Sequence, residues 1–302
     1  MQLEGMPRAL IEDLVDGALR VKAEGLGAVR SRRQALAGRS VVNCFFEPST
    51  RTKTSFELAG KYLGADVVNF QTRGSSLEKG ETLEDTVRTL EALALDVLVI
   101  RHAVSGVPER LAQAVTIPVI NAGDGFHEHP TQGLLDVLTV YEARGRIDGL
   151  HLVIVGDILH SRVARSDLWG FLTLGAYVTL VGPPQLLPSA WHHERLRVTP
   201  YLADALKEAD AVQVLRIQKE RQSLAGLPSW EEYRAQWGIT RERAEQLGDH
   251  VLIMHPGPQN RGVEIDSEVM MRTASQISRQ VTNGVAVRMA ALSWVLGGAD
   301  EH

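Results

Sequence analysis

The sequence predicts an α/β protein built from two doubly wound parallel-sheet domains joined by helices. Three observations support this fold class. The chain has 302 residues, which exceeds the usual size of a single domain and favours two. Apolar runs of strand length alternate with segments in which apolar residues recur every three or four positions, as in helices. The runs are rich in Val, Ile and Leu without interruption, which is typical of parallel strands covered on both faces.

The apolar runs fall into two series of four. The expected strands are residues 39–46, 65–70, 96–101 and 117–123, followed by 150–157, 176–183, 209–216 and 250–258.

The segment between the two series indicates where the domains meet. Residues 130–149 have helical period and end in Gly and charge, so we expect a helix that joins two domains. The predicted domains are residues 1–145 and 146–281, and an apolar helix within 282–302 is expected to pack back on the first domain. Residues 226–247 are polar and aromatic, which predicts a loop and helix excursion over the surface.

Composition excludes several classes of protein. The net charge of −5 argues against a nucleic-acid or anionic-membrane surface, since both need clustered Lys and Arg. No apolar run reaches the roughly 18 residues that would span a bilayer, and the N-terminus lacks the pattern of a secretory signal. The single cysteine, Cys44, lies in the apolar run VVNCFF, so we expect a buried thiol rather than a nucleophile. These features predict a cytoplasmic protein.

The stretch FFEPSTRTKTSFE, residues 45–57, predicts an anion site. Pro48 ends a strand and Ser49 is a good helix N-cap, so backbone N–H groups and the positive helix end face outward. The alternative is an ordinary capped helix, for which Ser49 alone would suffice. Arg51 and Thr52 in the first turn favour the anion, because a cation there opposes the helix dipole unless an anionic ligand compensates it.

Two further strand ends of the first domain carry polar residues. Arg101 and His102 end one strand, and a solvated strand end is an equally good interpretation of that pair. In GDGFHEHPTQ, His129 and Gln132 lie three residues apart at a helix start, so both can face one ligand. Glu128 between two histidines could suggest a metal, but no further ligand follows at a typical spacing, and we expect none.

Strand ends of the second domain favour a carboxylate-bearing ligand. GDILHSRVARS, which contains Arg162, matches neither a dinucleotide nor a nucleoside-triphosphate glycine motif. Arg162 and Arg216 would suit a dicarboxylate, because a guanidinium binds carboxylates bidentately; for either arginine alone, a surface salt bridge is the stronger alternative. In HPGP, two prolines bracket Gly257, which favours a cis bond and leaves carbonyls that can accept from an NH₂ group. Ligands of such sheets bind at the carboxyl ends of strands, so we expect an active site in the cleft between the domains.

Several motifs in this order resemble one family. PSTRT with SFE, SSLEKGETLEDT, RH, HPTQ-LLD, RIQKER and HPGP-NRGVEI are similar to the catalytic chains of aspartate carbamoyltransferases, from about residue 40 to the C-terminal helix. PSTRT and HPTQ are shared with ornithine carbamoyltransferases. The KGET lysine, RIQKER and HPGP select the aspartate branch, because the ornithine enzymes typically have His-Cys-Leu-Pro at the position of HPGP.

The resemblance implies the roles of the polar residues. The phosphate of carbamoyl phosphate would bind to Ser49, Thr50, Arg51 and Thr52. The groups that meet its carbonyl oxygen would be Thr52, Arg101 and His129. The acceptors of its NH₂ group would be Gln132 and the carbonyls of Gly257 and Pro258. The aspartate carboxylates would be held by Arg162, Arg216 and Gln218. Lys79 would reach in from a neighbouring subunit together with Ser75 or Ser76, and Lys79 would act with Thr52, Arg101 and His129 in catalysis.

The implied activity is transfer of the carbamoyl group of carbamoyl phosphate to L-aspartate, the second step of de novo pyrimidine (UMP) biosynthesis, without a cofactor. The resemblance implies a homotrimer with shared active sites, and leaves open whether a dihydroorotase or a regulatory chain is a partner. Three alternatives remain: a carbamoyltransferase acting on ornithine or another amine, a non-catalytic carbamoyl-phosphate-binding subunit, and, more distantly, an NAD-dependent dehydrogenase.

Overall fold

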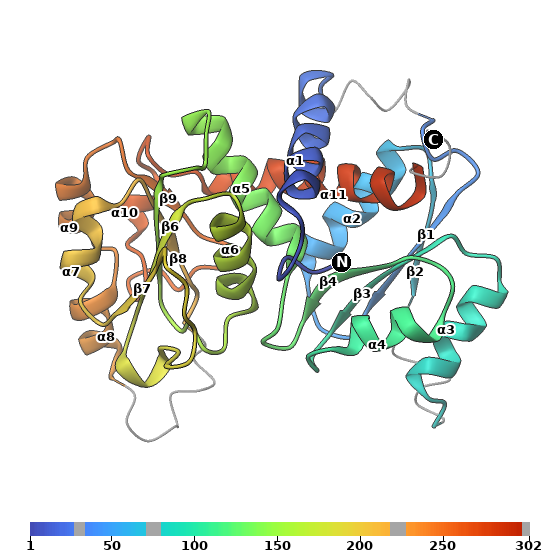
Figure 1. Cartoon of the computed structure of the whole chain (residues 1–302), viewed down its shortest axis with the longest axis horizontal. Coiled ribbons are helices and arrows are strands. Elements are labelled where there is room, and N and C mark those ends of the chain that lie inside the picture. Colours follow the sequence, from blue (N-terminus) through green and yellow to red (C-terminus); the bar gives the residue numbers. More distant parts are fainter. Residues whose placement is uncertain (27–33, 71–79, 218–227, 298–302) are drawn as a thin grey trace. The chain divides into compact units, whose positions relative to one another are not determined.

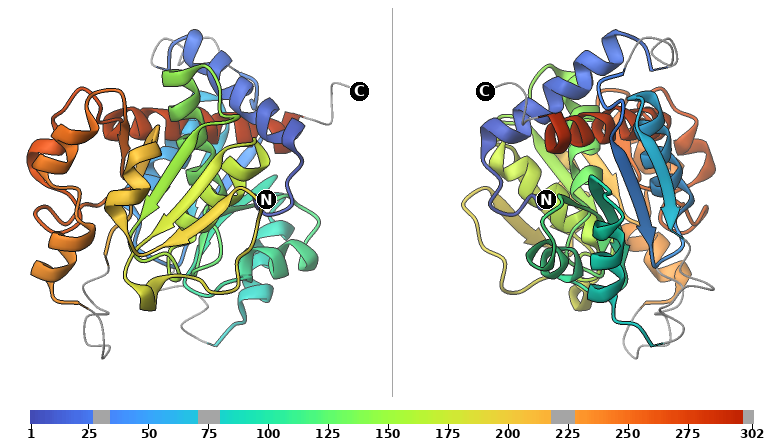
Figure 2. Two further views of the ribbon diagram at one scale, coloured as in Figure 1. Left: turned by 60° about the vertical axis from the view of Figure 1, so that its left-hand side comes forward. Right: turned by 90° about the vertical axis from the view of Figure 1, so that its right-hand side faces the viewer.

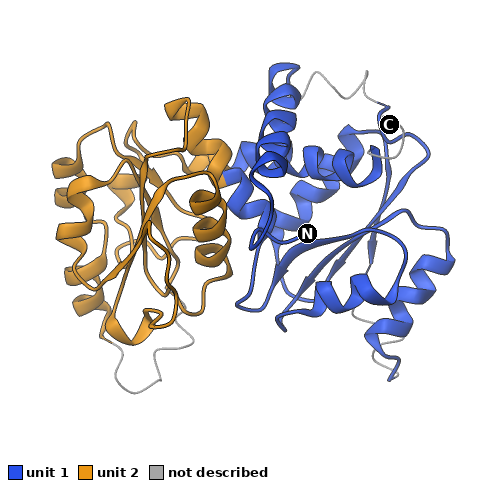
Figure 3. Ribbon diagram, in the orientation of Figure 1, with its two compact units in different colours: residues 1–135, 281–302 blue, residues 136–280 orange. Residues whose placement is uncertain are grey.

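The computed structural model describes residues 1–26, 34–70, 80–217 and 228–297. The chain forms two compact units: unit 1 comprises residues 1–135 and 281–302, and unit 2 comprises residues 136–280 (Figure 3). In each unit a single parallel sheet is covered by helices. The predicted α/β class with two parallel-sheet domains is therefore confirmed.

The chain passes between the units inside two helices. Helix α5, Pro130–Arg144, changes unit after residue 135, and helix α11, Ile277–Gly297, changes unit after residue 280. Near the start of α5, Leu135 lies against Gly284 of α11 within unit 1. At the end of α5, Arg144 donates to the carbonyl of Asp210 in unit 2. The sequence analysis set the first boundary at residue 145, after this helix; the structure divides the helix itself, because its two ends contact different units.

Unit 1 contains a four-stranded sheet in the order β2-β1-β3-β4. Its other elements alternate with these strands: α1 Arg8–Ala23, β1 Ser40–Phe45, α2 Thr50–Tyr62, β2 Asp66–Phe70, α3 Leu83–Ala92, β3 Val97–His102, α4 Val107–Ala114 and β4 Val119–Asp124. Helices α2, α1 and α11 cover one face of the sheet, and α3 and α4 cover the other (Figures 1 and 2). The guanidinium of Arg288 on α11 lies over the ring of Phe56 on α2, 5.2 Å from its centroid.

Unit 2 contains a five-stranded parallel sheet in the order β7-β6-β5-β8-β9. Its elements are β5 His151–Val155, α6 Arg162–Thr173, β6 Tyr177–Val181, η3 Pro184–Leu186, β7 Leu196–Thr199, α7 Leu202–Ala205, η4 Leu206–Glu208, β8 Ala211–Val214, α8 Trp230–Trp237, α9 Arg241–Leu247, β9 Leu252–Met254 and α10 Ser267–Met270. Helix α6 lies on one face of this sheet, and α7, α8 and α9 lie on the other (Figure 1). The sequence analysis did not predict β7, an edge strand whose four residues include an exposed Arg197 and offer no apolar run.

The prediction of a loop and helix excursion at residues 226–247 is correct about helix in its described part but not about the aromatic residues, which are buried. This region forms α8 and α9, which close the core of unit 2. Tyr233 and Trp237 are almost completely buried, and the indole N–H of Trp237 donates to the carbonyl of Pro200. The many charged residues made this region look polar. Two large aromatic side chains nevertheless form a buried face, because each of them buries a large apolar area.

The single cysteine behaves as expected. Cys44 lies in β1, is buried, and belongs to the core cluster between the sheet of unit 1 and helices α3 and α4. Burial raises the pKa of its thiol to about 12, so the thiolate is absent at neutral pH and the side chain is inert as a nucleophile. Among the described residues, none of the helices has both the length and the hydropathy needed to cross a membrane.

A buried polar cluster lies in unit 2 between the sheet and the layer of α5 and α6. Val212 and Val214 of β8 face the core under α7 to α9, so Gln213 points to the opposite face. There its amide donates to Asp136 of α5 at 2.7 Å and to Asp167 of α6 at 2.9 Å. Burial, followed by the charge of Asp136, raises the pKa of Asp167 well above its usual range. The two carboxyl groups share one amide, and burial together with their mutual repulsion makes Asp167 keep its proton to a higher pH than an exposed aspartate would.

We expect Asp167→Asn to stabilise the protein at neutral and alkaline pH. A raised folded-state pKa means that the folded chain holds a proton which the unfolded chain releases above about pH 4, so stability falls as pH rises towards the folded pKa. An amide at position 167 does not titrate, so this loss of folding free energy disappears. Each kcal/mol of added unfolding free energy corresponds to a rise in Tm of roughly 2–4 °C. Thermal unfolding of both proteins between pH 4 and pH 9 measures the effect, and the difference should shrink towards pH 4. An equal or larger stabilisation at pH 4 would contradict a raised pKa of Asp167 in the folded chain.

Candidate active site

Three neighbouring strands of unit 1 end in the polar segments singled out from the sequence. β1 leads into Ser49 and the start of α2, β3 ends with Arg101 and His102, and β4 leads into the segment that contains His129. β3 pairs in parallel with both β1 and β4, so the carboxyl ends of all three strands lie at one edge of the sheet. Ligands of open α/β sheets bind at this edge.

The start of α2 presents unused hydrogen-bonding groups. Ser49 occupies the N-cap position with extended backbone geometry, yet its side chain forms no cap hydrogen bond with the helix. The first turn holds no acidic residue, and the leading N–H groups of any helix lack partners within it. Thr50 and Arg51 are exposed beside these groups. Ser49 therefore occupies the N-cap position without capping the helix through its side chain, and the arrangement suits an oxyanion.

Thr52 and His129 meet although they come from different helices. Thr52 lies in the first turn of α2, and His129 immediately precedes α5. The hydroxyl of Thr52 lies 3.3 Å from Nε2 of His129, and both side chains are buried. Gln132 is also buried, one turn further along α5, and its backbone N–H donates to the carbonyl of His129. The structure thus brings together two of the residues predicted for the carbonyl oxygen.

Arg101 is held beside the start of α2 by an ion pair. It pairs across the sheet with Phe45, and its Nε donates to the carboxylate of Glu47 at 3.2 Å. The side chain of Arg101 is only 14% exposed, so this pair is largely removed from solvent. The sequence analysis did not single out Glu47. The sequence gives no local signal for this role, because Glu47 and Arg101 lie 54 positions apart along the chain.

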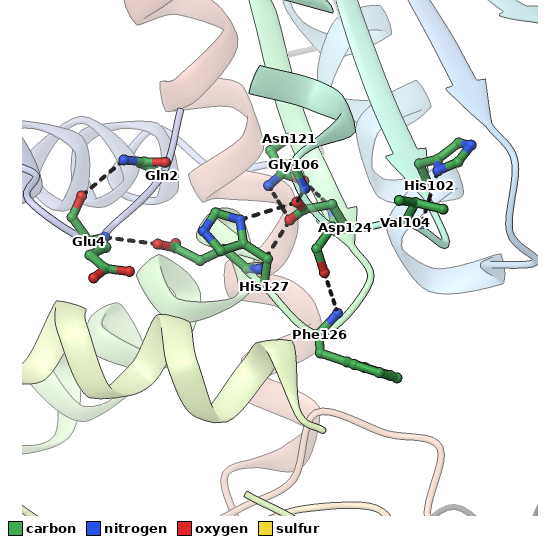
Figure 4. Close-up of polar contacts among 12 residues, drawn as sticks. Gln2, Glu4, His102, Val104, Gly106, Asn121, Asp124, Phe126 and His127 are labelled. Atoms are coloured by element: carbon green, nitrogen blue, oxygen red, sulfur yellow. Dashed lines mark hydrogen bonds and ion pairs between the residues drawn. The ribbon is translucent and has the colours of Figure 1, made fainter. Parts of the chain in front are cut away.

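Asp124, at the end of β4, organises the loop that leads to His129. Its buried carboxylate accepts from the amide of Asn121 and from the backbone N–H groups of Gly106 and Glu128, and it contacts the ring of His127 at 3.1 Å (Figure 4). The sequence analysis missed this residue, because a single Asp in a GDG segment is equally typical of an ordinary turn. Its role became visible only from the four partners it gathers.

Gly125 allows this loop to turn. Its φ of +44° lies in the left-handed region, and a Cβ atom would come within 2.6 Å of the backbone nitrogen of Ser105. Ser105 in turn accepts from the backbone N–H of Phe126 through its hydroxyl (Figure 4). Any side chain at position 125 would displace the backbone that carries the site, which explains why a glycine stands there.

Glu128 anchors the N-terminal segment of the chain. Its carboxylate is fully buried and accepts from the backbone N–H groups of Leu3 at 2.7 Å and Glu4 at 2.9 Å. The possible ligand atoms of Glu4, His127 and Glu128 lie within 4.8 Å of one another. His129, however, points to Thr52, so the two histidines around Glu128 do not share a site. The oxygens of Glu128 are engaged by backbone donors, and nothing further in this cluster points to an ion.

The two arginines predicted for unit 2 emerge from neighbouring strands. Arg162 is the first residue of α6, which follows β5, and Ser161 caps that helix by accepting from the N–H of Ala164. Arg216 follows β8, which pairs in parallel with β5. The loop after β5 approaches this strand end closely, since a Cβ atom on Gly156 would lie 2.8 Å from that of Leu215. The carboxyl ends of β5 and β8 therefore present both guanidinium-bearing segments at one edge.

The HPGP turn follows β9, the next strand in the sheet of unit 2. The bond between Gly257 and Pro258 is cis, as the paired prolines favoured. His255 is buried, and its Nδ1 accepts from the N–H of Gly257 at 2.8 Å. The turn thus has a defined backbone before any ligand is present. Lys79, Ser75, Ser76 and Gln218, which the resemblance also assigns to the site, lie outside the described residues.

The chain has the two-domain parallel α/β architecture, with polar residues at the carboxyl ends of its strands, and comparisons with known proteins identify the family. Residues 1–142 match the aspartate/ornithine carbamoyltransferase, carbamoyl-P binding domain, and residues 148–295 match the Asp/Orn binding domain of the same family. The chain therefore belongs to the aspartate/ornithine carbamoyltransferase family.

Relatives within this family lie in the aspartate branch. The chain is 52% identical to an aspartate carbamoyltransferase catalytic subunit of Frankia casuarinae, covering 95% of this chain and 90% of the relative. It is also 52% identical to that of Roseiflexus castenholzii, covering 97% and 93%. Among solved structures it resembles the Trypanosoma cruzi enzyme in complex with carbamoyl aspartate and phosphate (TM-score 0.88, 33% identity, 98% and 94% covered). The catalytic subunit of M. jannaschii aspartate transcarbamoylase gives a TM-score of 0.87 at 32% identity, with 100% and 99% covered. The predicted resemblance is confirmed.

Proposed function

We propose that this chain transfers the carbamoyl group of carbamoyl phosphate to the α-amino group of L-aspartate, giving N-carbamoyl-L-aspartate and phosphate. The observation that carries this assignment is the buried contact of Thr52 with His129 beside the open start of α2. It supplies donors for a carbonyl oxygen next to groups suited to a phosphate. Relatives at about half identity over nearly the whole chain support the same reaction.

Residues of unit 1 are proposed to bind carbamoyl phosphate. The phosphate takes the N–H groups at the start of α2 together with Ser49, Thr50, Arg51 and Thr52. The carbonyl oxygen accepts from Thr52, Arg101 and His129, which stabilise the negative charge that develops there during attack. Glu47 holds Arg101 in place through the ion pair at 3.2 Å. Gln132 accepts from the NH₂ group through its side-chain oxygen.

Residues of unit 2 are proposed to bind the second substrate. Arg162 and Arg216 hold the two carboxylates of aspartate, because each guanidinium can bind a carboxylate bidentately. The carbonyls of Gly257 and Pro258 accept from the carbamoyl NH₂. Gln218 and Lys79 complete the proposed site, with Lys79 contributed by a neighbouring subunit of a homotrimer in the cytoplasm.

The proposed reaction needs little covalent chemistry from the protein. The amino group attacks the carbamoyl carbon, a tetrahedral oxyanion forms, and the bond to the phosphate oxygen breaks. The departing phosphate takes up the proton of the attacking amine, so the chain need supply no general base. Catalysis then comes from holding the two substrates together and from fixed donors around the oxyanion.

The purified chain should release phosphate from carbamoyl phosphate in the presence of L-aspartate but not of L-ornithine. Mass spectrometry should identify N-carbamoyl-aspartate as the product, and light scattering should give the mass of a trimer. Phosphate release with ornithine would reassign the substrate, since a cationic side chain would then have to be tolerated by Arg162 and Arg216. Binding of carbamoyl phosphate without turnover of any amine would indicate a non-catalytic subunit.

A further inference from the structure

The carboxylate of Glu264 is fully buried in unit 2 and gathers three donors. Nε2 of His255 lies 3.3 Å from its Oε1, the backbone N–H of Asn260 donates to Oε1 at 2.5 Å, and the side-chain amide of Asn260 donates to Oε2 at 3.1 Å. The N–H of Gly257 donates to Nδ1 of His255, so that nitrogen carries no proton. The ring proton therefore sits on Nε2 and donates to Glu264. A buried carboxylate with this set of donors is fixed in one orientation.

The hydrogen bonds around Glu264 connect the HPGP turn with the strand end that bears Arg216, two segments assigned to the proposed active site. His255 and Gly257 belong to the HPGP turn, whose carbonyls are assigned to the carbamoyl NH₂. The second amide hydrogen of Asn260 donates to the carbonyl of Ile217 at 2.8 Å. Ile217 directly follows Arg216, and its side chain is buried in the core of unit 2. The turn and the arginine-bearing strand end are thus joined by hydrogen bonds through one asparagine.

We infer that Asn260, oriented by Glu264, is a positioning residue that sets the backbone at Ile217 and hence the direction of Arg216 relative to the HPGP turn. The inference rests on the proposed function, because it assumes that Arg216 binds a substrate carboxylate. Neither Asn260 nor Glu264 needs to touch a substrate. Their effect is geometric: a bidentate guanidinium contact requires the arginine to be aimed, and a displacement of about 1 Å in a reacting group can cost on the order of 10²-fold in rate.

Asn260→Ala tests the link to Ile217. The KM for aspartate should rise about tenfold or more, while the KM for carbamoyl phosphate stays close to that of the wild type. Gln276→Ala is the matched control, since Gln276 is also a buried amide of unit 2, but it donates to a different backbone carbonyl, that of Ala274 at 3.3 Å. Equal KM values for aspartate in the two variants would overturn the inference. A wild-type chain without turnover on aspartate would overturn the proposed function as well.

A double substitution separates positioning from stability. In Asn260→Asp with Glu264→Gln, the amide and the carboxylate exchange places, so residues 260 and 264 can still bond to each other, but residue 260 no longer donates to Ile217. A melting temperature above that of Glu264→Gln alone, but with the KM for aspartate still raised, is the expected result, because the carboxylate at position 260 cannot donate to the carbonyl of Ile217. A wild-type KM for aspartate in the double variant would show that the hydrogen bond to Ile217 does not position Arg216, and would overturn the inference.

Discussion

His129→Ala is expected to lower kcat by about 10²–10³-fold, because it removes one fixed donor from the oxygen that becomes negative during attack. The imidazole is buried and lies 3.3 Å from the hydroxyl of Thr52, so solvent has little access to replace it. The measurement is the steady-state release of phosphate with both substrates saturating. Thr52→Val keeps the shape of the neighbouring side chain but removes its hydroxyl, and the same direction of change is expected.

Removal of a histidine outside the proposed site should leave kcat unchanged. His192 is exposed in unit 2, and His192→Ala serves as the control. The melting temperature of His129→Ala must stay near that of the wild type if the loss concerns the reaction rather than folding. Turnover of His129→Ala within a few fold of the wild type, with a folded protein, would remove His129 from the proposed catalytic set.

Arg216→Ala is expected to raise the KM for aspartate by about 10²–10³-fold, the cost of leaving a desolvated carboxylate without its cation. Saturation by carbamoyl phosphate should change much less, because unit 1 supplies the groups assigned to the phosphate. Arg216→Lys keeps the charge but not the bidentate geometry, so an intermediate rise is expected. Initial rates over a matrix of the two substrate concentrations provide both constants.

Arg197→Ala provides the matched control for this prediction. Arg197 lies exposed on the edge strand β7 of the same unit, so its removal takes away the same charge without touching the strand end that bears Arg216. A similar rise in the KM for aspartate in both variants would mean that general charge attraction, and not a specific contact, explains the effect. Unchanged KM in Arg216→Ala would exclude that residue from the aspartate site.

The sequence was a good guide to the sheets and to the edges on which the site residues lie. Continuous apolar runs of strand length such as residues 96–101 favour buried parallel strands, and polar residues directly after such strands lie at the sheet edge where ligands bind. The edge strand β7 was not predicted. It pairs with one neighbouring strand and has exposed residues, so its sequence does not need a continuous apolar run. The sequence analysis did not predict the burial of Tyr233 and Trp237. It counted apolar positions, whereas the stability gained by packing depends on the apolar area that each side chain buries.

Residues that hold the site in place were much harder to predict than residues that face a ligand. Glu47, Asp124 and Glu264 act through partners distant along the chain or through several backbone N–H groups, and no local spacing identifies such a set. Similarly, only the structure shows that the side chain of Ser49 forms no cap hydrogen bond with α2.

The sequence by itself determined the fold class, the family, the thiol's burial and the identities of the polar groups at the strand ends, since these follow from local composition and from motifs. The tertiary structure alone decided that Thr52 meets His129, that Asp136 and Asp167 share one amide, and that Asn260 joins the HPGP turn to Ile217. The physical reason is the same in each case. Buried polar groups must find partners, and only the packing of distant segments determines which partners are within reach.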